Sequence, residues 1–311
     1  MTETINIALA ADSNYVQHVA VVIASVMKNT AARNVCFYLL SDGIDEDKKE
    51  KIQTTASSFG AQVEIIELSG LSLFDDLFTS GHISKAAYFR LDIANLVSAS
   101  VKKIIYTDVD LVVRGDIEEL WSFDMQGKPL AAVPDLGIMS STRLMKQKHD
   151  ILGIKTEDNY FNSGVLIIDV EAWRKGEYAK SVIELAASGD LPHHDQDALN
   201  KVFYGKWQEL PISWNVIPPV YNLFFKLLKS SKFRDKALKA KRDMRIMHFA
   251  GRYKPWEFAK QTCFNNEYYD YLSLTAFKDA SMPQPGRNMK GKSLTRALWR
   301  LKLADFWNSI L

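Results

Sequence analysis

The chain has 311 residues, of which 47% are hydrophobic and 24% are charged. This composition is typical of a globular protein with one large α/β domain or a domain with an appendage, and it excludes wholesale disorder. No stretch approaches the ~20 consecutive apolar residues that a membrane-spanning helix needs. Cys36 and Cys263 are too few for a disulfide framework or a cysteine-based zinc site. The first residues lack the basic and apolar regions of a secretory signal, so the cytosol is the expected compartment.

Strand and helix patterns alternate along the first half of the chain. Short apolar runs predict buried strands, and longer amphipathic stretches predict helices between them. The strands are expected at 5–10, 35–40, 62–68 and 103–106, and the helices at 15–28, 45–59 and 86–97. This alternation indicates βαβ units and a mostly parallel sheet flanked by helices. In such open sheets a ligand binds beyond the carboxyl ends of the strands.

The second half repeats this pattern less regularly. Strands are predicted at 130–134 and 164–169, a helix at 195–204, and helix-forming residues dominate from 221 to 242. The segment Pro283-Gln-Pro285-Gly286 has the composition of a linker. We therefore expect a main domain over residues 1–282 and a separate basic tail over residues 283–311.

Basic residues are concentrated late in the chain. Residues 226–245 hold nine basic and two acidic residues, and the stretch from Gly286 onward holds six basic residues and one acid, Asp305. Each segment carries more positive charge than the whole chain, whose net charge is +2. Such segments suit a phosphate-bearing partner or an anionic lipid surface. For 226–245 the alternative is an ordinary solvated helix face.

Two carboxylates follow the predicted strand at 103–106. Asp108 and Asp110 are separated by one residue, and residues i and i+2 of an extended chain point the same way. Two carboxylates on one side can share a divalent cation, and their hard oxygen atoms suit Mg²⁺ or Mn²⁺. Such a metal commonly neutralises a substrate diphosphate. The alternative is a pair of surface or capping carboxylates.

A second candidate segment runs from Met247 to Trp256. His248 could supply a metal ligand, Gly251 a closely approaching backbone and Lys254 a phosphate-binding cation. A single His is also common as a structural residue.

Polar residues also occur at 161–164 and 193–197. Asn162 enters a predicted buried strand, although a turn before that strand is the alternative. The adjacent pair His193-His194 is a poor zinc site because neighbouring side chains diverge. The carboxylates and amide of Asp195-Gln196-Asp197 are better suited to recognising sugar hydroxyls, which need both donors and acceptors.

Seven short motifs occur in a fixed order between Ile5 and Trp256, and together they resemble glycosyltransferase family 8. This family contains retaining galactosyl- and glucosyltransferases related to bacterial lipopolysaccharide enzymes and to glycogenin. The motifs are Ala10-Ala11-Asp12-Ser13-Asn14-Tyr15, His82-Ile83-Ser84, Tyr88-Phe89-Arg90-Leu91, Tyr106-Thr107-Asp108-Val109-Asp110, Phe161-Asn162-Ser163-Gly164, Asp195-Gln196-Asp197 and the segment from His248 to Trp256. The resemblance implies a nucleotide-diphospho-sugar transferase fold of the GT-A type.

The resemblance also implies a UDP-sugar donor, either UDP-galactose or UDP-glucose, and a bound Mn²⁺, with Mg²⁺ as the alternative metal. Asp108, Asp110 and His248 match the metal ligands of the family. A second set of matches consists of nucleotide-contacting positions: Tyr15 for stacking on uracil, Asp12 and Asn14 for the base and ribose, Gly251 and Lys254 for the diphosphate, and Ala10 and Val109 beside them. A fixed positive charge at Lys254 would face the negative charge of the leaving group.

Further matches imply a donor-sugar site, at Arg90, Asn162, Asp195 and Gln196, with Asp135 as an added candidate. Gln196 corresponds to the group that faces the donor sugar from its β-face. A neutral amide is a poor nucleophile, which makes double displacement through Gln196 doubtful. Front-face substitution with retention is the implied alternative, and Asp197 is a reserve nucleophile.

The basic tail over residues 283–311 has an amphipathic pattern. Leu294, Leu298 and Leu301 form an apolar stripe beside basic residues and Trp299, a pattern typical of a helix lying in an anionic membrane interface. A terminal helix docked on the protein is the alternative. We expect a saccharide or glycolipid acceptor of a surface glycan, an enzyme at the cytoplasmic face of a membrane, and no nucleic-acid partner.

Two other function classes compete with the glycosyltransferase. A phosphatase of the haloacid dehalogenase type also has an Asp-x-Asp motif after a strand, but usually after the first strand. A sugar-nucleotide-binding protein without turnover is the non-catalytic alternative, which the presence of Asp108, Asp110 and His248 argues against.

Overall fold

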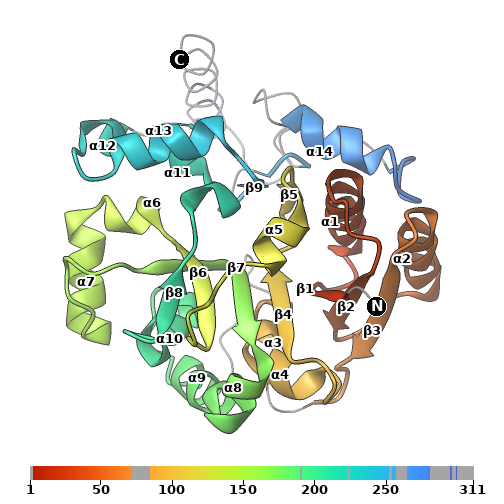
Figure 1. The fold of residues 1–311 in the computed structure, drawn as a ribbon, viewed down its shortest axis with the longest axis horizontal. Helices are drawn as coiled ribbons and strands as arrows, with labels where there is room; N and C mark the ends of the chain where they lie inside the picture. Colours follow the sequence, from red (N-terminus) through yellow and green to blue (C-terminus); the bar gives the residue numbers. More distant parts are fainter. Residues whose placement is uncertain are drawn as a thin grey trace.

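The computed structural model describes residues 3–71, 74, 85–189, 191–222, 225–251, 254–256, 265–280, 295 and 299. A seven-stranded sheet in the order β3-β2-β1-β4-β7-β6-β8 forms its centre (Figure 1). The strands are β1 (Ile5–Ala10), β2 (Val35–Ser41), β3 (Gln62–Glu67), β4 (Lys103–Thr107), β6 (Leu130–Pro134), β7 (Phe161–Asp169) and β8 (Trp207–Glu209). Four of the six strand pairings are parallel, which confirms the mostly parallel sheet.

The strand β7 runs antiparallel to both of its neighbours, β4 and β6. Its first residues therefore lie at the edge where β1, β4 and β6 have their carboxyl ends. The predicted strand at 164–169 is too short, since β7 begins at Phe161 and includes Asn162 and Ser163. The polar residues at the start of β7 therefore lie beside the polar residues that follow β4 and β6.

A small second sheet lies beside this edge. It consists of β5 (Leu111–Val113) and β9 (Ile246–His248), which pair antiparallel, with Leu111 opposite His248. The pairing brings a segment from late in the chain next to the end of β4. This long-range contact positions His248 against the residues that follow β4.

Helices surround the central sheet (Figure 1). Their bounds are α1 (Val16–Asn29), α2 (Glu46–Ser58), α3 (Ala86–Phe89), η2 (Arg90–Asp92), α4 (Ile93–Leu96), α5 (Ile117–Trp121), α6 (Leu136–Met139), α7 (Thr142–Leu152), α8 (Val170–Lys175), α9 (Tyr178–Ala187), α10 (His194–Val202), η3 (Ile212–Trp214), α11 (Pro218–Tyr221), α12 (Phe225–Lys229), α13 (Arg234–Arg242) and α14 (Asn265–Leu272). The expected continuous helix at 86–97 is wrong in detail, because a 3-10 turn interrupts it. The expected helical run at 221–242 is likewise divided into short helices.

The core lies between the sheet and these helices. The strand β1 is almost wholly buried, and α1 buries ten of its fourteen residues. Burial on both faces explains the continuous apolar runs of the central strands. A rigid sheet therefore supports the residues at its edge.

The proposed linker at 283–286 and almost all of the tail at 283–311 lie outside the described residues, as does the motif His82-Ile83-Ser84. The division into residues 1–282 and 283–311 therefore stays a prediction. Within the part of the chain that the structure describes, no helix has the length and apolar character needed to cross a membrane.

Candidate active site

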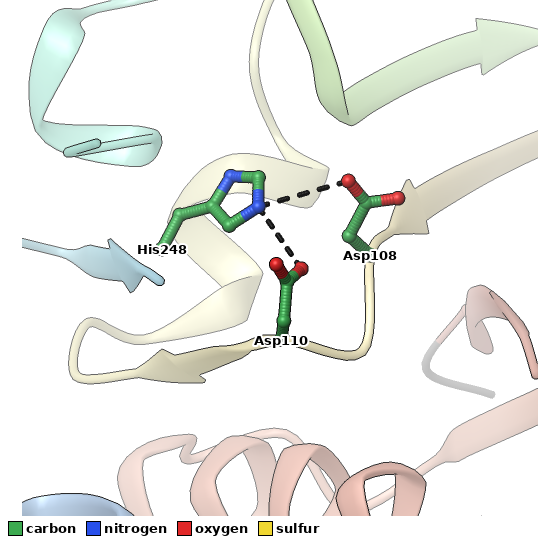
Figure 2. A group of neighbouring side chains, drawn as sticks. All are labelled: Asp108, Asp110 and His248. Carbon is green, nitrogen blue, oxygen red and sulfur yellow. Dashed lines mark hydrogen bonds and ion pairs between the residues drawn. The ribbon is translucent and has the colours of Figure 1, made fainter. Parts of the chain in front are cut away.

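Asp108, Asp110 and His248 converge at the carboxyl end of β4 (Figure 2). One ligand atom from each residue lies within 4.8 Å of the others. The His248 Nε2 atom is 3.0 Å from Asp110 Oδ1 and 3.7 Å from Asp108 Oδ2. The two aspartates meet across a bend between β4 and β5, and not along an extended strand as the sequence predicts.

The donor set of this group fits a divalent cation. Two carboxylates and one imidazole provide hard oxygen atoms and one nitrogen, which suits Mn²⁺ or Mg²⁺. Gly164 is part of the fit, because a Cβ there would lie 2.4 Å from His248 Cε1 and 2.8 Å from Asp108 Oδ2. Only a glycine lets β7 approach these ligands so closely.

Lys254 brings a cation to the same group. Its ammonium hydrogen-bonds Asp110 and donates to the Phe249 carbonyl oxygen at 2.8 Å. Burial acts to raise the pKa of Asp110, but Lys254 and His248 outweigh it and hold this pKa well below its usual value. Asp110 is therefore an anion ready to bind a cation.

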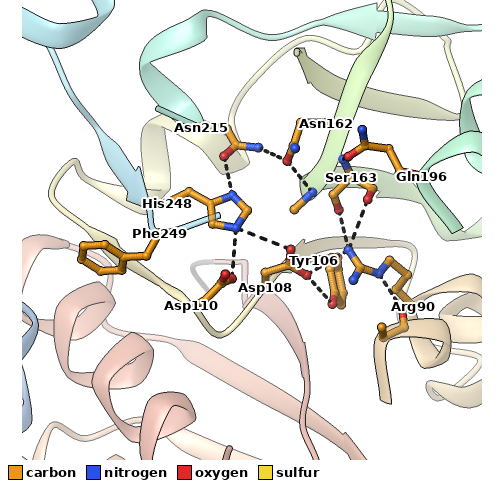
Figure 3. A network of polar contacts seen from close by, with 12 residues as sticks. Arg90, Tyr106, Asp108, Asp110, Asn162, Ser163, Gln196, Asn215, His248 and Phe249 are labelled. Carbon is orange, nitrogen blue, oxygen red and sulfur yellow. Dashed lines mark hydrogen bonds and ion pairs between the residues drawn. The ribbon is translucent and has the colours of Figure 1, made fainter. Parts of the chain in front are cut away.

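Arg90 contacts residues of both the metal candidates and the donor-sugar-site candidates (Figure 3). Its Nη1 is 2.9 Å from Asp108 Oδ1, and its Nε is 3.3 Å from Asp195 Oδ2. Nη1 also donates to the Ser163 carbonyl oxygen at 2.9 Å. Burial opposes the charge on the guanidinium, yet Asp108, Tyr106 and Asp195 raise the pKa of Arg90. Burial raises the pKa of Asp195, which Arg90 partly offsets.

Gln196, Asp135 and Asn162 form a second polar cluster beside Arg90. The side-chain oxygen of Gln196 accepts from the backbone amide of Ser163 at 3.1 Å. The side-chain NH₂ group of Gln196 donates to Asp135 Oδ2 at 3.4 Å. Asn162 donates to the same carboxylate oxygen at 3.2 Å. The structure thus brings the sugar-site candidates Arg90, Asp135, Asn162, Asp195 and Gln196 to one edge of the sheet.

Asp197 is connected to this cluster by the Tyr160 hydroxyl, which contacts both Gln196 and Asp197. Its carboxylate is 0% exposed and lies 2.6 Å from the equally buried ammonium of Lys148 on α7. The carboxylate also accepts from the Tyr160 hydroxyl at 2.7 Å and from the His193 amide at 2.8 Å. Such a fully bonded, buried carboxylate has the surroundings of a structural ion pair and not those of a nucleophile.

The nucleotide candidates follow β1, next to β4. Asp12 accepts from the backbone amides of Asn14 at 2.8 Å and Tyr15 at 3.2 Å, which shapes the turn into α1. The Tyr15 ring lies edge-on to Trp256, with 6.0 Å between the ring centroids. Ala10, the last residue of β1, is buried. Val109, between the two aspartates, is buried as well.

Gly251 has the backbone conformation that glycine favours, with φ at 86°. Apart from the glycine itself and its neighbours in the chain, no atom of the described residues lies within 4 Å of the place that a Cβ would occupy there. This open backbone lies three residues before Lys254. Arg252 and Tyr253 between them lie outside the described residues.

A family model described as glycosyl transferase family 8 matches residues 6–260 of this chain. The chain belongs to glycosyltransferase family 8. Its relatives include General stress protein A of Bacillus subtilis (strain 168), at 33% identity over 90% of this chain and 97% of that protein. Lipopolysaccharide 1,2-glucosyltransferase of Escherichia coli (strain K12) is 27% identical over 82% of this chain and 73% of that enzyme.

Solved structures confirm the fold of this family 8 enzyme. The galactosyltransferase LgtC, solved with donor and acceptor sugar analogs, superposes with a TM-score of 0.76 at 24% identity, over 90% of this chain and 98% of LgtC. The bifunctional glycosyltransferase WbbM gives a TM-score of 0.78 at 20% identity, and this chain spans about half of it, 51%. The expected GT-A fold is therefore correct.

Membership of family 8 identifies the protein as a glycosyltransferase and overturns the phosphatase alternative. The Asp-x-Asp segment follows the fourth strand in chain order, in agreement with this correction. Within the described ranges, Asp108, Asp110 and His248 form the one group with metal-ligand geometry, and His193-His194 do not join it.

Several residues of the site have no signal in the sequence. Asn215, at the end of η3, accepts a hydrogen bond from His248, and Lys148 neutralises Asp197. His18 stacks on Trp256 with 3.6 Å between ring centroids. Each contact joins residues more than 30 positions apart, so no local pattern indicates it.

Proposed function

We propose that this family 8 enzyme is a retaining hexosyltransferase, dependent on Mn²⁺, that transfers galactose or glucose from a UDP-sugar to a saccharide acceptor. The observation that supports this most is the group Asp108, Asp110 and His248, with Lys254 bonded to Asp110. The same group is connected to Gln196 through Arg90 and Ser163, and to Asn162 through Asn215. A diphosphate bound at Lys254 and at the metal candidates Asp108, Asp110 and His248 would place the attached sugar beside Gln196 and Asn162.

The donor is held by this chain's own residues in three regions. Tyr15, Asp12 and Asn14 receive the uridine, and Lys254 with the Gly251 backbone receives the diphosphate. A metal held by Asp108, Asp110 and His248 would neutralise diphosphate charge when bound. Asp135, Asn162 and Gln196 provide both donors and acceptors for the sugar hydroxyls.

Retention is assigned to front-face substitution. The bond from sugar C1 to the β-phosphate oxygen breaks, the acceptor oxygen bonds C1 on the same face, and its proton passes to the departing phosphate oxygen. Gln196 is neutral and hydrogen-bonded, and the carboxylate of Asp197 is paired with Lys148. Neither group is suited to attack C1, which supports substitution without a covalent intermediate.

We assign the acceptor to a surface glycan of the lipopolysaccharide type, because a relative bears the name lipopolysaccharide 1,2-glucosyltransferase. The basic tail would hold the enzyme on the cytoplasmic face of an anionic membrane that carries such a glycolipid.

Release of UDP from a panel of UDP-sugars, followed by an acceptor screen with linkage analysis, tests this function. We expect slow UDP release from one hexose donor, faster release with acceptor, and a product of retained anomeric configuration. Asp108→Asn or Asp110→Asn should lower turnover at least ~100-fold, and EDTA should do the same until Mn²⁺ is restored. Full activity in EDTA would contradict the metal assignment, and binding of UDP-sugar without turnover would indicate a non-catalytic protein.

A further inference from the structure

Asn215 connects the metal candidate His248 with the sugar-site candidate Asn162 (Figure 3). It follows η3 and is only 2% exposed. One end of its amide lies 2.9 Å from His248 Nδ1, and the other end lies 2.8 Å from Asn162 Oδ1. Each end of this buried amide therefore contacts a different half of the proposed site.

The direction of these hydrogen bonds follows from one backbone group. The Gly164 amide, which can only donate, lies 3.0 Å from the side-chain oxygen of Asn162. The oxygen of Asn162 is thus an acceptor, and the Asn215 atom that faces it must be the NH₂ group. The oxygen of Asn215 then faces His248 Nδ1, so that Nδ1 must bear the proton.

This assignment decides what the other ring nitrogen can do. In a neutral imidazole with a proton on Nδ1, Nε2 carries a lone pair. That nitrogen lies 3.0 Å from Asp110 Oδ1, and two acceptors at this distance need a proton or a cation between them. The tautomer set by Asn215 is therefore the one that binds a metal through Nε2.

The backbone keeps this arrangement in place. The His248 amide donates to the Val216 carbonyl oxygen at 3.1 Å, and the Val216 amide donates to the Ile246 carbonyl oxygen at 2.9 Å. The chain directly after Asn215 is thus held in register with β9. The side chains of Asn215 and His248 face each other because Val216, the residue after Asn215, is paired with β9.

We propose that Asn215 is a positioning residue that fixes His248 in the metal-binding tautomer and couples it, through Asn162, to the donor-sugar site. The proposal rests on the proposed function, since it needs His248 to be a metal ligand. It predicts two separable effects of Asn215, one on metal affinity through its oxygen and one on sugar transfer through its NH₂ group.

Two substitutions separate these effects. Asn215→Leu removes both hydrogen bonds, and we expect Mn²⁺ affinity to fall 10- to 100-fold in titrations followed by electron paramagnetic resonance. Asn215→Asp keeps an acceptor for His248 but loses the donor to Asn162. It should bind Mn²⁺ within about 3-fold of the unaltered protein or more tightly, while kcat falls at least ~10-fold. Asn29→Leu is the matched control, since Asn29 donates to Ser25, Val113 and Tyr271, none of which is a residue of the proposed site, and its Mn²⁺ affinity should not change.

Nuclear magnetic resonance of the metal-free, unaltered protein at about pH 8.5 provides a test that needs no variant to fold. Long-range ¹H–¹⁵N correlations, assigned to His248 by their loss in His248→Gln, should show the proton on Nδ1. Absence of a proton from Nδ1, or unchanged Mn²⁺ affinity in Asn215→Leu, would overturn the role of Asn215. Failure of the unaltered protein to bind Mn²⁺ would instead overturn the proposed metal site.

Discussion

The ammonium of Lys254 is hydrogen-bonded to Asp110, a carboxylate of the proposed metal site, and also to the Phe249 carbonyl oxygen at 2.8 Å. A positive charge here competes with a metal for the same carboxylate. We therefore expect Lys254→Met to bind Mn²⁺ about 10-fold more tightly in the absence of nucleotide, and to transfer sugar much more slowly. This gain is a fraction of the ~4 kcal/mol between two charges 4 Å apart at an effective dielectric constant of ~20.

Isothermal titration with Mn²⁺ checks this prediction. Lys146→Met is the control, because Lys146 pairs with Asp150 at an exposed position on α7. Equal or weaker Mn²⁺ binding by Lys254→Met would show that the ammonium does not compete with the metal.

Gln196 should matter for sugar transfer and little for UDP. Its side-chain amide contacts Ser163, Asp135 and Tyr160, in the proposed donor-sugar site. We expect Gln196→Ala to reduce kcat/KM at least ~30-fold while the Kd of UDP changes less than ~3-fold, because UDP lacks the sugar. Steady-state kinetics and calorimetry with UDP measure the two effects. Comparable losses in both would move Gln196 to the nucleotide site or to a structural role.

The buried pair of Asp197 and Lys148 should support the fold. Both side chains are 0% exposed, so Asp197→Ala leaves the buried ammonium of Lys148 without its carboxylate partner and should lower the free energy of unfolding by ~3–5 kcal/mol. The double variant with Lys148→Met should recover part of this loss. Asp150→Ala, at an exposed ion pair, should change stability by less than ~1 kcal/mol in the same urea titrations. Unchanged stability together with abolished transfer would restore Asp197 as a candidate nucleophile.

His18 should make stability depend on pH. Burial, partly offset by Asp110, lowers the pKa of His18 to about 3, while an unfolded His has a pKa near 6.5. Because the unfolded state binds the extra proton, the stabilisation is complete above pH ~6.5 and is lost as the pH falls toward 3. From pH 7 to pH 5 the loss is at most ~2 kcal/mol, at ~1.4 kcal/mol per pH unit.

His18→Phe keeps a ring against Trp256 and cannot titrate. Urea unfolding at pH 7 and pH 5 should therefore show a smaller decrease in this variant than in the unaltered protein. An equal decrease in both proteins would exclude His18 as the titrating group.

Truncation after Pro285 should release the protein from membranes. The removed segment contains six basic residues and one acid, and each basic residue near an anionic surface contributes ~1 kcal/mol to binding. The full chain should sediment with anionic liposomes and dissociate at high salt, whereas the truncated chain should remain in the supernatant. Transfer to a small saccharide acceptor should survive, because the residues of the proposed site all precede the cut. Unchanged liposome binding would refute the anchor, and lost transfer with a lower Tm would indicate a docked helix.

Local patterns in the sequence determined most of the sheet and the chemical character of the site. Buried strands read as apolar runs because both of their faces are covered, and the polar residues after β1 and β4 follow from the rule that ligands bind at the carboxyl ends of strands. The motifs that resemble family 8 led to the correct family and to the acidic pair.

Only the tertiary structure decided how these residues act on one another. Asn215 reaches His248 through the pairing beside β9, and Lys148 reaches Asp197 from another helix. The antiparallel direction of β7 brings Asn162 to the edge where β4 ends. These contacts join residues 30 or more positions apart, and their free energy depends on burial and on the geometry of hydrogen bonds. A local sequence pattern describes neither quantity, so the partners of each charged group became apparent only in the folded chain.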